Sequence, residues 1–507
     1  MRVTPNSQKA EVKIVGGSTF GRYRKISSEK TYNMFISDGW LINTAGYQKV
    51  AEILSFGEGR VIYNSSRGKF LLVVINSFVY TLNEGLSPLF IGRLSTDNGP
   101  VYVDENLNSQ ICIVDGVNAY IYNYSIPTPG LTVQTGLGTL VPGYVEYHNT
   151  FFLFGNASKT VNGAAWYAYQ YATPTTIVQA TPGQFALQTK PDYALAVLRI
   201  PGQSANVLVI GSIVSEIWTQ IGGTQNYRRA NTISIDYGCV SVATIATSDL
   251  YVCWLAINES NAPVIMVYDA SGFRSISTDG INHQLSHIEF PEESSGMFFR
   301  QDGHLFYQLT FYNEEDNLTF LYDFNTQMFF NLTDWDLNYH PARNYAYFNQ
   351  QLYFISLNSP AIYLASMDLS TYNENLAGTQ NPDPDINHEI QRIRICNTIR
   401  IPDSSQFRPN SFVFTIEQGN DRRVTGLSLA AAVAANQLPY RPRVDLSISK
   451  DDGVTWSNTV SRNLNASGDR QNILNWENMG MCNTLIIKLR FWGLSNFICN
   501  NGQLEIY

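Results

Sequence analysis

One motif in this 507-residue chain has the residue types and the spacing of a defined turn. Ser449, Asp451, Gly453, Thr455 and Trp456 fit the pattern S-x-D-x-G-x-T-W. An Asp-Gly step favours a hairpin turn in which Gly453 has a positive φ. The side chains of Ser449 and Asp451 can accept hydrogen bonds from turn amides, and we expect Trp456 to pack beneath the loop. The motif therefore predicts a structural hairpin.

The same pattern, the Asp-box, occurs in sialidases, which are β-propeller enzymes. Sialidase chemistry needs convergent arginines for the substrate carboxylate and a tyrosine nucleophile with an acidic partner. Such enzymes repeat the box on several blades, whereas this chain has one full copy. The arginines considered for such a site are Arg228, Arg229, Arg343, Arg392 and Arg394. Their spacing in the sequence does not indicate that any three of them converge. We predict that the chain is not an enzyme. The alternative is a carbohydrate-active propeller, either a sialidase-like hydrolase or a lectin-like receptor-binding protein.

The other residues with chemical potential give weaker patterns. The acidic pairs Glu292-Glu293 and Glu314-Glu315 lie in polar stretches typical of solvated loops. His283 and His287 are four residues apart, which suits one helix face, but residues 281–290 show no helical periodicity, so we expect loop histidines. No complete glycine-rich nucleotide loop and no G-x-S-x-G motif occurs. The sequence predicts no catalytic residue, no cofactor and no metal.

The composition favours strands and turns over helices. Hydrophobic residues make up 44% and aromatic residues 13% of the chain, while charged residues are only 15%. This composition excludes a disordered chain. The net charge of −9 argues against a protein that holds duplex DNA by broad neutralisation of phosphates. No apolar run reaches the roughly 18 residues of a membrane-spanning helix. Six dispersed cysteines without a C-x-x-C pair indicate reduced thiols and synthesis in the cytosol.

A weak internal repeat carries the prediction of the fold. Strands that contain an aromatic residue and end in a polar turn recur every 41 to 54 residues, at Tyr80, Tyr122, Tyr167, Trp218, Tyr268, Tyr322 and Tyr363. Units of this length with about four short strands are typical of propeller blades, because a single meander cannot cover its own apolar faces. We predict an all-β chain with an irregular β-propeller of six or seven blades. A set of β-sandwiches is the alternative.

The pattern divides the chain into four parts. We expect an extended N-terminal arm over 1–50, the β-propeller over 51–375, a polar linker over 376–388 and a C-terminal β-sandwich over 389–507 that carries the Asp-box-like hairpin. The Ala-rich segment 426–438 is either one exposed helix or an insertion. The first 60 residues hold nine basic and five acidic side chains, so the arm either docks on an acidic partner or is a solvated tail.

Several stretches together resemble a known family, the packaged-DNA stabilisation proteins that form the tail hub, or nozzle, of short-tailed bacteriophages. The first is Tyr32-Asn33-Met34 running to Thr44-Ala45-Gly46-Tyr47, where Ala45 replaces the usual proline. The others are Val209 to Ser212 with Glu216-Ile217-Trp218 and Gly222-Gly223-Thr224, Ile235 and Gly238 with Ala246 to Asp249, Trp254 and Tyr268 to Ser271, and the Ser449 to Trp456 hairpin with Ile487 to Arg490.

The resemblance implies a structural protein of the virion that is assembled in the host cytoplasm. It implies a homohexameric ring below the portal and the adaptor, or head-completion, protein. The central channel of the ring retains the packaged DNA and later conducts it without sequence specificity. A tail needle or plug docks below, and tailspikes or fibres attach at the side. A ring of acidic subunits repels the DNA backbone, so we hypothesise that an exiting genome slides through it.

Overall fold

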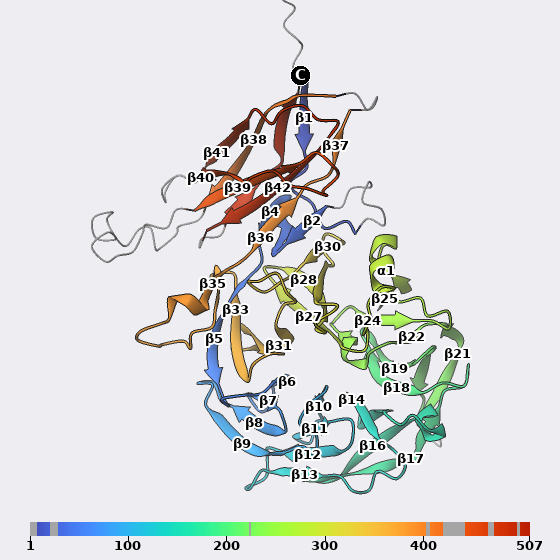
Figure 1. Ribbon diagram of the computed structural model, residues 1–507. Helices are drawn as coiled ribbons and strands as arrows, with labels where there is room; N and C mark the ends of the chain where they lie inside the picture. Colours follow the sequence, from blue (N-terminus) through green and yellow to red (C-terminus); the bar gives the residue numbers. More distant parts are fainter. Residues whose placement is uncertain are drawn as a thin grey trace, which may run out of the picture.

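The computed structural model describes residues 8–20, 29–222, 225–401, 406–418, 442–464, 471–493 and 497–506. Within these ranges the chain is built from strands, with a single short α-helix, and the predicted all-β class is confirmed. Figure 1 shows a ring of small sheets below and a two-layered sheet structure above it. No helix among the described residues is long and apolar enough to span a membrane.

Six blades of the ring are formed by strands that follow one another along the chain. Blade 1 is β6 (Gly59–Ser65), β7 (Phe70–Ile75), β8 (Phe78–Leu82) and β9 (Pro88–Arg93), and blade 2 is β10 (Tyr102–Glu105), β11 (Gln110–Val114), β12 (Ala119–Asn123) and β13 (Leu131–Val133). Blade 3 is β14 (Pro142–His148), β15 (Phe151–Asn156), β16 (Ala165–Thr173) and β17 (Thr176–Ala186), and blade 4 is β18 (Ala194–Ile200), β19 (Gln203–Gly211), β20 (Ser215–Gln220) and β21 (Tyr227–Ile235). Blade 5 is β22 (Gly238–Cys239), β23 (Ala246–Thr247), β24 (Val252–Ile257), β25 (Val264–Asp269) and β26 (Gly272–Ser275), and blade 6 is β27 (Ser294–Gln301), β28 (His304–Phe311), β29 (Leu318–Asp323) and β30 (Met328–Asn331).

The seventh blade closes the ring with a strand from near the start of the chain. It consists of β31 (Ala342–Phe348), β32 (Gln351–Ser356) and β33 (Ala361–Ser366), with β5 (Gly46–Glu52) antiparallel to β33. The short strands β34 (Thr371–Asn373) and β35 (Asn387–Glu389) extend this sheet. Neighbouring blades contact one another in cyclic order around the ring, and β31 of the last blade returns to β6 of the first. The fourth strand of the last blade, β5, thus joins the two ends of the propeller segment.

The repeated aromatic positions all fall in the third strand of a blade, from Tyr80 in β8 to Tyr363 in β33. The second strands are buried on both faces, as in β11, because each sheet is packed between two neighbours. Asp269 and Asp323 accept hydrogen bonds from the amides of Ser271 and Asn325 at 2.8 and 2.9 Å, which closes the turn after the third strand. These are the Tyr-Asp turns that marked the repeat.

Two sheets form the upper part of the molecule in Figure 1. The first contains β3 (Met34–Ser37), β4 (Trp40–Asn43), β43 (Phe497–Cys499), β38 (Pro409–Gln418), β44 (Gly502–Ile506), β1 (Gln8–Val12) and β41 (Asn472–Glu477). The second contains β2 (Lys30–Tyr32), β36 (Arg392–Ile395), β42 (Thr484–Trp492), β39 (Arg443–Ser449), β40 (Val460–Asn463) and β37 (Ile399–Arg400). Because β2 also pairs with β30, this second sheet is continuous with blade 6. We refer to the two sheets as the sandwich.

The segment expected as an N-terminal arm contributes β1 to β4 to the sandwich and β5 to the propeller. Residues 376–388 contain the 3-10 turn Pro384–Ile386. The Ala-rich segment 426–438 lies outside the described residues. The core between the two sheets includes Phe412, Trp476 and Leu489, and it continues into blade 6 through Phe306 and Phe330. The sandwich and blade 6 therefore share one hydrophobic core.

The helix α1 (Asp279–Leu285) corrects the expectation that residues 281–290 form a loop. Thr278 is its N-cap, with a side chain that accepts a hydrogen bond from the amide of Ile281. Ile281 and Leu285 are buried one turn apart. His283 therefore lies on a helix. With only two apolar residues in phase, the periodicity of this segment is too short to be seen in the sequence.

Candidate functional site

The Asp-box-like motif forms a tight turn at the end of β39. Asp452 and Gly453 have φ values of 60° and 89°, as a type I′ turn requires at its two central positions. The Ser449 hydroxyl accepts a hydrogen bond from the amide of Gly453 at 2.9 Å. Asp451 accepts one from the amide of Thr455 at 2.9 Å and another from the Thr455 hydroxyl at 2.5 Å. These hydrogen bonds from Thr455 lower the pKa of Asp451 to about 2.

Trp456 extends the motif onto the outer face of the sandwich. Its ring is half-buried, and the ammonium of Lys488, on the neighbouring strand β42, lies 4.4 Å from the ring centroid. This distance is that of a cation–π contact. The turn therefore supports an aromatic ring beside a basic strand.

The arginines considered for a sialidase-like site lie in three separate sheets. Arg229 on β21 is 3.6 Å from the carboxylate of Glu216, and Arg343 on β31 is 3.7 Å from that of Glu58. Arg228 lies on β21 as well, whereas Arg392 and Arg394 are fully buried on β36 in the sandwich. These five guanidinium groups do not converge on one site, so they do not form the arginine cluster that the hydrolase alternative needs.

Side chains from the innermost strands meet near the axis of the propeller. The rings of Tyr102 on β10 and Tyr144 on β14 have centroids 4.8 Å apart. Burial raises the pKa of Tyr102. Two groups from other blades also affect this pKa: Cys239 of blade 5 raises it and Arg343 of blade 7 lowers it. Arg343 also donates to the carbonyl of Gly59 in blade 1 at 3.3 Å.

A cavity of about 670 Å³ opens where the innermost strands end. Two buried carboxylates, Asp104 and Glu146, line it together with Arg199. Arg199 forms a hydrogen-bonded ion pair with Glu146 and lies 3.6 Å from Asp104. Burial, followed by the charge of Asp104, raises the pKa of Glu146 to about 7. The cavity can hold a proton or a cationic group, and its carboxylates already have a cationic partner in Arg199.

A hydrogen-bonded chain of Ser37, His304 and Asp323 has the connectivity of a hydrolase triad. His304 Nδ1 is 2.9 Å from Asp323 Oδ2, and His304 Nε2 is 3.0 Å from Ser37 Oγ. Asp323 also accepts from the Thr326 hydroxyl at 2.7 Å, and the ring of Phe35 packs edge-on against the imidazole. The chain connects the β3–β4 turn of the sandwich to blade 6, so we interpret it as structural. Sequence reasoning missed it because Ser37 and His304 are 267 residues apart.

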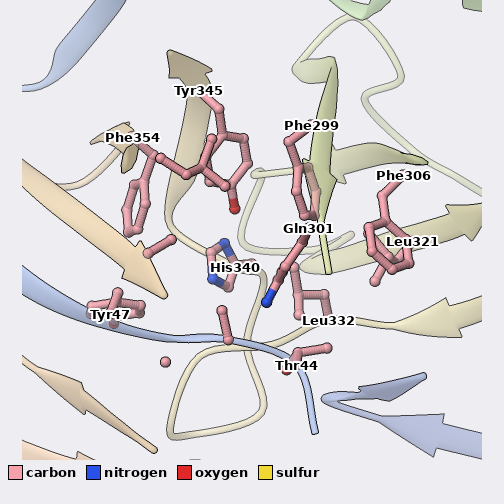
Figure 2. A pocket seen from close by; sticks show the side chains of 14 residues that line it. Thr44, Tyr47, Phe299, Gln301, Phe306, Leu321, Leu332, His340, Tyr345 and Phe354 are labelled. Atoms are coloured by element: carbon pink, nitrogen blue, oxygen red, sulfur yellow. The ribbon is translucent and has the colours of Figure 1, made fainter. Parts of the chain in front are cut away.

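Figure 2 shows a second cavity, where residues 44–47 pass between blades 6 and 7. The side chains of His340 and Gln301 lie in this cavity among aromatic and aliphatic lining residues, which include Phe299, Tyr345 and Phe354. Its volume of about 20 Å³ leaves room for about one water molecule. Burial lowers the pKa of His340 to about 3, so the imidazole is neutral at neutral pH. This is a packing gap and too small for a ligand.

The described residues contain no group of three or more histidine, cysteine or acidic side chains placed to hold a metal. All six cysteines are buried and unpaired with one another. Burial raises the pKa of each thiol, for example that of Cys239 to about 12, which makes these thiols poor nucleophiles.

Comparison with known proteins gives one family match. A family model described as bacteriophage P22 Gp10, beta-propeller, matches residues 29–368. No curated protein matches the chain.

Solved propeller structures resemble it only distantly. A streptogramin B lyase structure is 10% identical, with a TM-score of 0.42 over 64% of this chain and 98% of the other. The Pan2 WD40 domain of Neurospora crassa is 9% identical, with a TM-score of 0.41 over 65% and 97%. A catalytically inactive virginiamycin B lyase from Staphylococcus aureus with quinupristin is 9% identical, with a TM-score of 0.42 over 64% and 99%. At these scores the likenesses carry no argument about this chain.

Proposed function

The chain belongs to the bacteriophage P22 Gp10 β-propeller family of phage DNA-stabilisation proteins, and from this membership we propose that it is the tail hub, or nozzle, of a short-tailed phage. In this role it is a structural component of the virion. Copies of the chain form a ring below the portal and the adaptor. The ring retains the packaged DNA and then forms the channel through which the genome leaves.

The observation that supports this arrangement best is the meeting of side chains near the propeller axis. Tyr102, Tyr144 and Arg343, from three different blades, bring bulky side chains together near the axis. We therefore place the channel that conducts duplex DNA between copies of the chain. A closed ring of identical subunits makes such a channel through heterologous contacts. We propose six copies.

The charges of the two parts of the molecule differ strongly. Residues 46–389, which include the propeller, contain 13 basic and 30 acidic side chains, a net charge of −17. The remaining residues contain 20 basic and 12 acidic side chains, a net charge of +8. Propellers with this charge that line a channel repel the phosphate backbone and keep the moving genome from adhering.

Exposed apolar side chains on an edge strand support permanent contacts with other chains. On β9 of blade 1, Leu89 is 64% and Phe90 51% exposed. Phe90 extends an aromatic group that includes Phe78 and Tyr80, at centroid distances of 6.1 and 5.6 Å. Exposed apolar edge strands are a liability for a free monomer, and assembly covers them. We propose that the adaptor above, a needle or plug below and tailspikes or fibres at the side use further surfaces, and that assembly takes place in the host cytoplasm.

The test is assembly of the purified full-length chain. Mass photometry should show closed oligomers of the 56.9 kDa chain, and these should bind DNA-filled heads that carry the adaptor. DNA leakage from such heads, measured as nuclease-sensitive DNA, should fall when the protein is added. A chain that stays monomeric and does not bind adaptor-bearing heads would refute the proposed function.

A further inference from the structure

The outer face of the second sandwich sheet carries a row of basic and aromatic side chains. We call Arg443, Trp456, Lys488, Arg490 and Trp492 the basic–aromatic strip. Along β42 every second residue is buried in the sandwich core, so Lys488, Arg490 and Trp492 lie on the opposite face. Arg443 lies on this face from β39, and Trp456 contacts it through Lys488. Strand periodicity therefore accounts for four of its five members, and the Asp-box-like turn supplies Trp456.

The two sheet strands of the strip place its members side by side. In the pairing of β39 with β42, Arg443 is opposite Trp492 and Asp445 is opposite Arg490. The guanidinium carbons of Arg490 and Arg443 lie 3.8 and 5.0 Å from the Trp492 ring centroid. Lys488 lies over Trp456 in the same way. Cation–π contacts hold these groups in position without neutralising them.

Acidic side chains balance only part of this charge. Asp445 is paired with Arg443 at 3.2 Å and also accepts hydrogen bonds from the Trp492 indole and the Ser461 hydroxyl, both at 2.6 Å. Arg490 experiences the charges of Asp445 and Glu389, and it donates to Gln391. No ion pair of Lys488 is found among the described residues.

The pKa values of Lys488 and Arg490 in the strip are lowered first by burial and then by neighbouring positive charge. Burial and then the charge of Arg490 lower the pKa of Lys488. Burial lowers the pKa of Arg490 as well, and the nearby Arg443 acts in the same direction. An anion at this face would relieve both effects, because it favours the charged forms.

We propose that the basic–aromatic strip contacts the phosphate backbone of the packaged DNA. This inference rests on the proposed function, which places DNA beside every copy of the chain. Lys488 and Arg490, two residues apart on an antiparallel strand, present their charges about 7 Å apart along the strand direction. Lysine and arginine are the usual phosphate ligands, and the contact needs no base recognition.

The charge distribution favours DNA over a protein partner. The part of the chain that contains the sandwich has a net charge of +8, whereas the rest has −17. Among the described residues outside 46–389 there are 12 basic and 9 acidic side chains, so the described sandwich is weakly basic where the propeller is strongly acidic. A ring of such subunits favours DNA at the level of its sandwiches over the level of its propellers. The genome is then held at one level and slides past the others, which suits both retention and release.

The experiment compares two double variants of the full-length chain. Lys488→Gln/Arg490→Gln removes two charges from the strip. Lys159→Gln/Arg93→Gln is the matched control, because it removes the same charges from cation–π contacts on the propeller, over Tyr193 and Phe78. Fluorescence anisotropy with labelled duplex DNA of mixed sequence, at several salt concentrations, gives the affinity and its salt dependence.

Loss of two phosphate contacts should make the slope of log K against log salt shallower by about 1.8. For equal affinities at 1 M salt, this change makes the variant's affinity for DNA about 60-fold weaker at 0.1 M salt. The control should keep the wild-type slope. Charge-conserving Lys488→Arg/Arg490→Lys should retain most of the affinity, and circular dichroism reports whether each variant is folded. A strip variant that is folded and keeps the wild-type slope would overturn the inference, and so would a control with an equal loss.

Mass photometry of the same samples separates this inference from the proposed function. A strip variant that loses self-association but keeps DNA binding would show that the strip contacts another copy of the chain, which overturns the inference. If the wild-type protein forms rings and the strip variant binds DNA normally, the proposed contact between the strip and DNA is refuted and the proposed function is not. Wild-type protein that forms no ring would instead contradict the proposed function.

Discussion

Removal of the buried guanidinium of Arg394 should destabilise the sandwich more than any surface substitution. Arg394 is fully buried on β36 and forms a hydrogen-bonded ion pair with Glu29. It also donates to the carbonyls of Gly17 and Lys13 and to the Thr31 hydroxyl, each at 3.1 Å. These contacts attach the chain segment around β2 to a strand more than 360 residues away.

The expected magnitude follows from what Arg394→Ala leaves behind. The carboxylate of Glu29, with only 12% of its side chain exposed, loses its cation, and three further acceptors lose a charged donor. Breaking a buried ion pair by removing one partner typically costs about 3–5 kcal/mol. We expect a loss in this range in the free energy of unfolding of the sandwich. Glu29→Gln should cost less, because a neutral amide can still accept hydrogen bonds from Arg394.

Native-state hydrogen exchange of amides in β36 and β42 measures this loss locally, which avoids treating the whole chain as a two-state system. The double variant Arg394→Ala/Glu29→Gln completes a thermodynamic cycle, and its loss should be smaller than the two single losses added together by about 1 kcal/mol or more. A loss below about 1 kcal/mol for Arg394→Ala, or strictly additive single effects, would refute the reasoning.

Three further predictions concern the Asp-box-like turn, the cavity lined by Asp104 and Glu146, and the exposed edge strand β9. Gly453→Ala should destabilise the sandwich by about 1–2 kcal/mol, because residue 453 has a φ of 89°. Steric crowding does not contribute, since an added methyl group would lie 3.9 Å from its nearest neighbour, Cδ1 of Ile486. Gly453→Asn should cost less, and equal losses in urea denaturation would contradict this. Because the pKa of Glu146 is raised to about 7 in the folded chain, the folded state binds more protons than the unfolded state between about pH 4.5 and 7, so stability should fall as the pH rises through this window. Glu146→Gln should flatten that part of the pH profile, and an unchanged profile in thermal melts would exclude Glu146 as its source. Leu89→Asp/Phe90→Asp on β9 should reduce ring assembly in mass photometry, whereas the isolated Val161→Asp, at a position 89% exposed, should not; equal effects would remove β9 from the interface.

The propeller could be predicted from the sequence because its signal is local. Each repeated aromatic residue, such as Tyr268, sits in a third strand whose partners are within about one blade of sequence. The Asp-Gly turn at Gly453 also depends on neighbouring residues only. Strand β5 could not be assigned to the last blade, because its partner β33 lies more than 300 residues further along and nothing local specifies that pairing.

The same reason explains what the sequence did not reveal at the candidate sites. The pairing of Arg394 with Glu29 and the chain from Ser37 to His304 each connect distant segments. The basic–aromatic strip depends on β39 and β42 being neighbours, a pairing made across residues 450–483. Arg443, Lys488 and Arg490 show no motif until that register is known. Local chemistry was visible in the sequence, but its assembly was not.

Cryo-electron microscopy of the assembled protein on DNA-filled, adaptor-bearing heads tests the central claim most directly. We expect a closed ring of copies with a channel wide enough for a duplex between them, DNA density at the level of the sandwiches, and Tyr102 and Tyr144 together near every propeller axis. DNA density along the axis of a single propeller, or particles in which the chain is absent from the genome path, would contradict it.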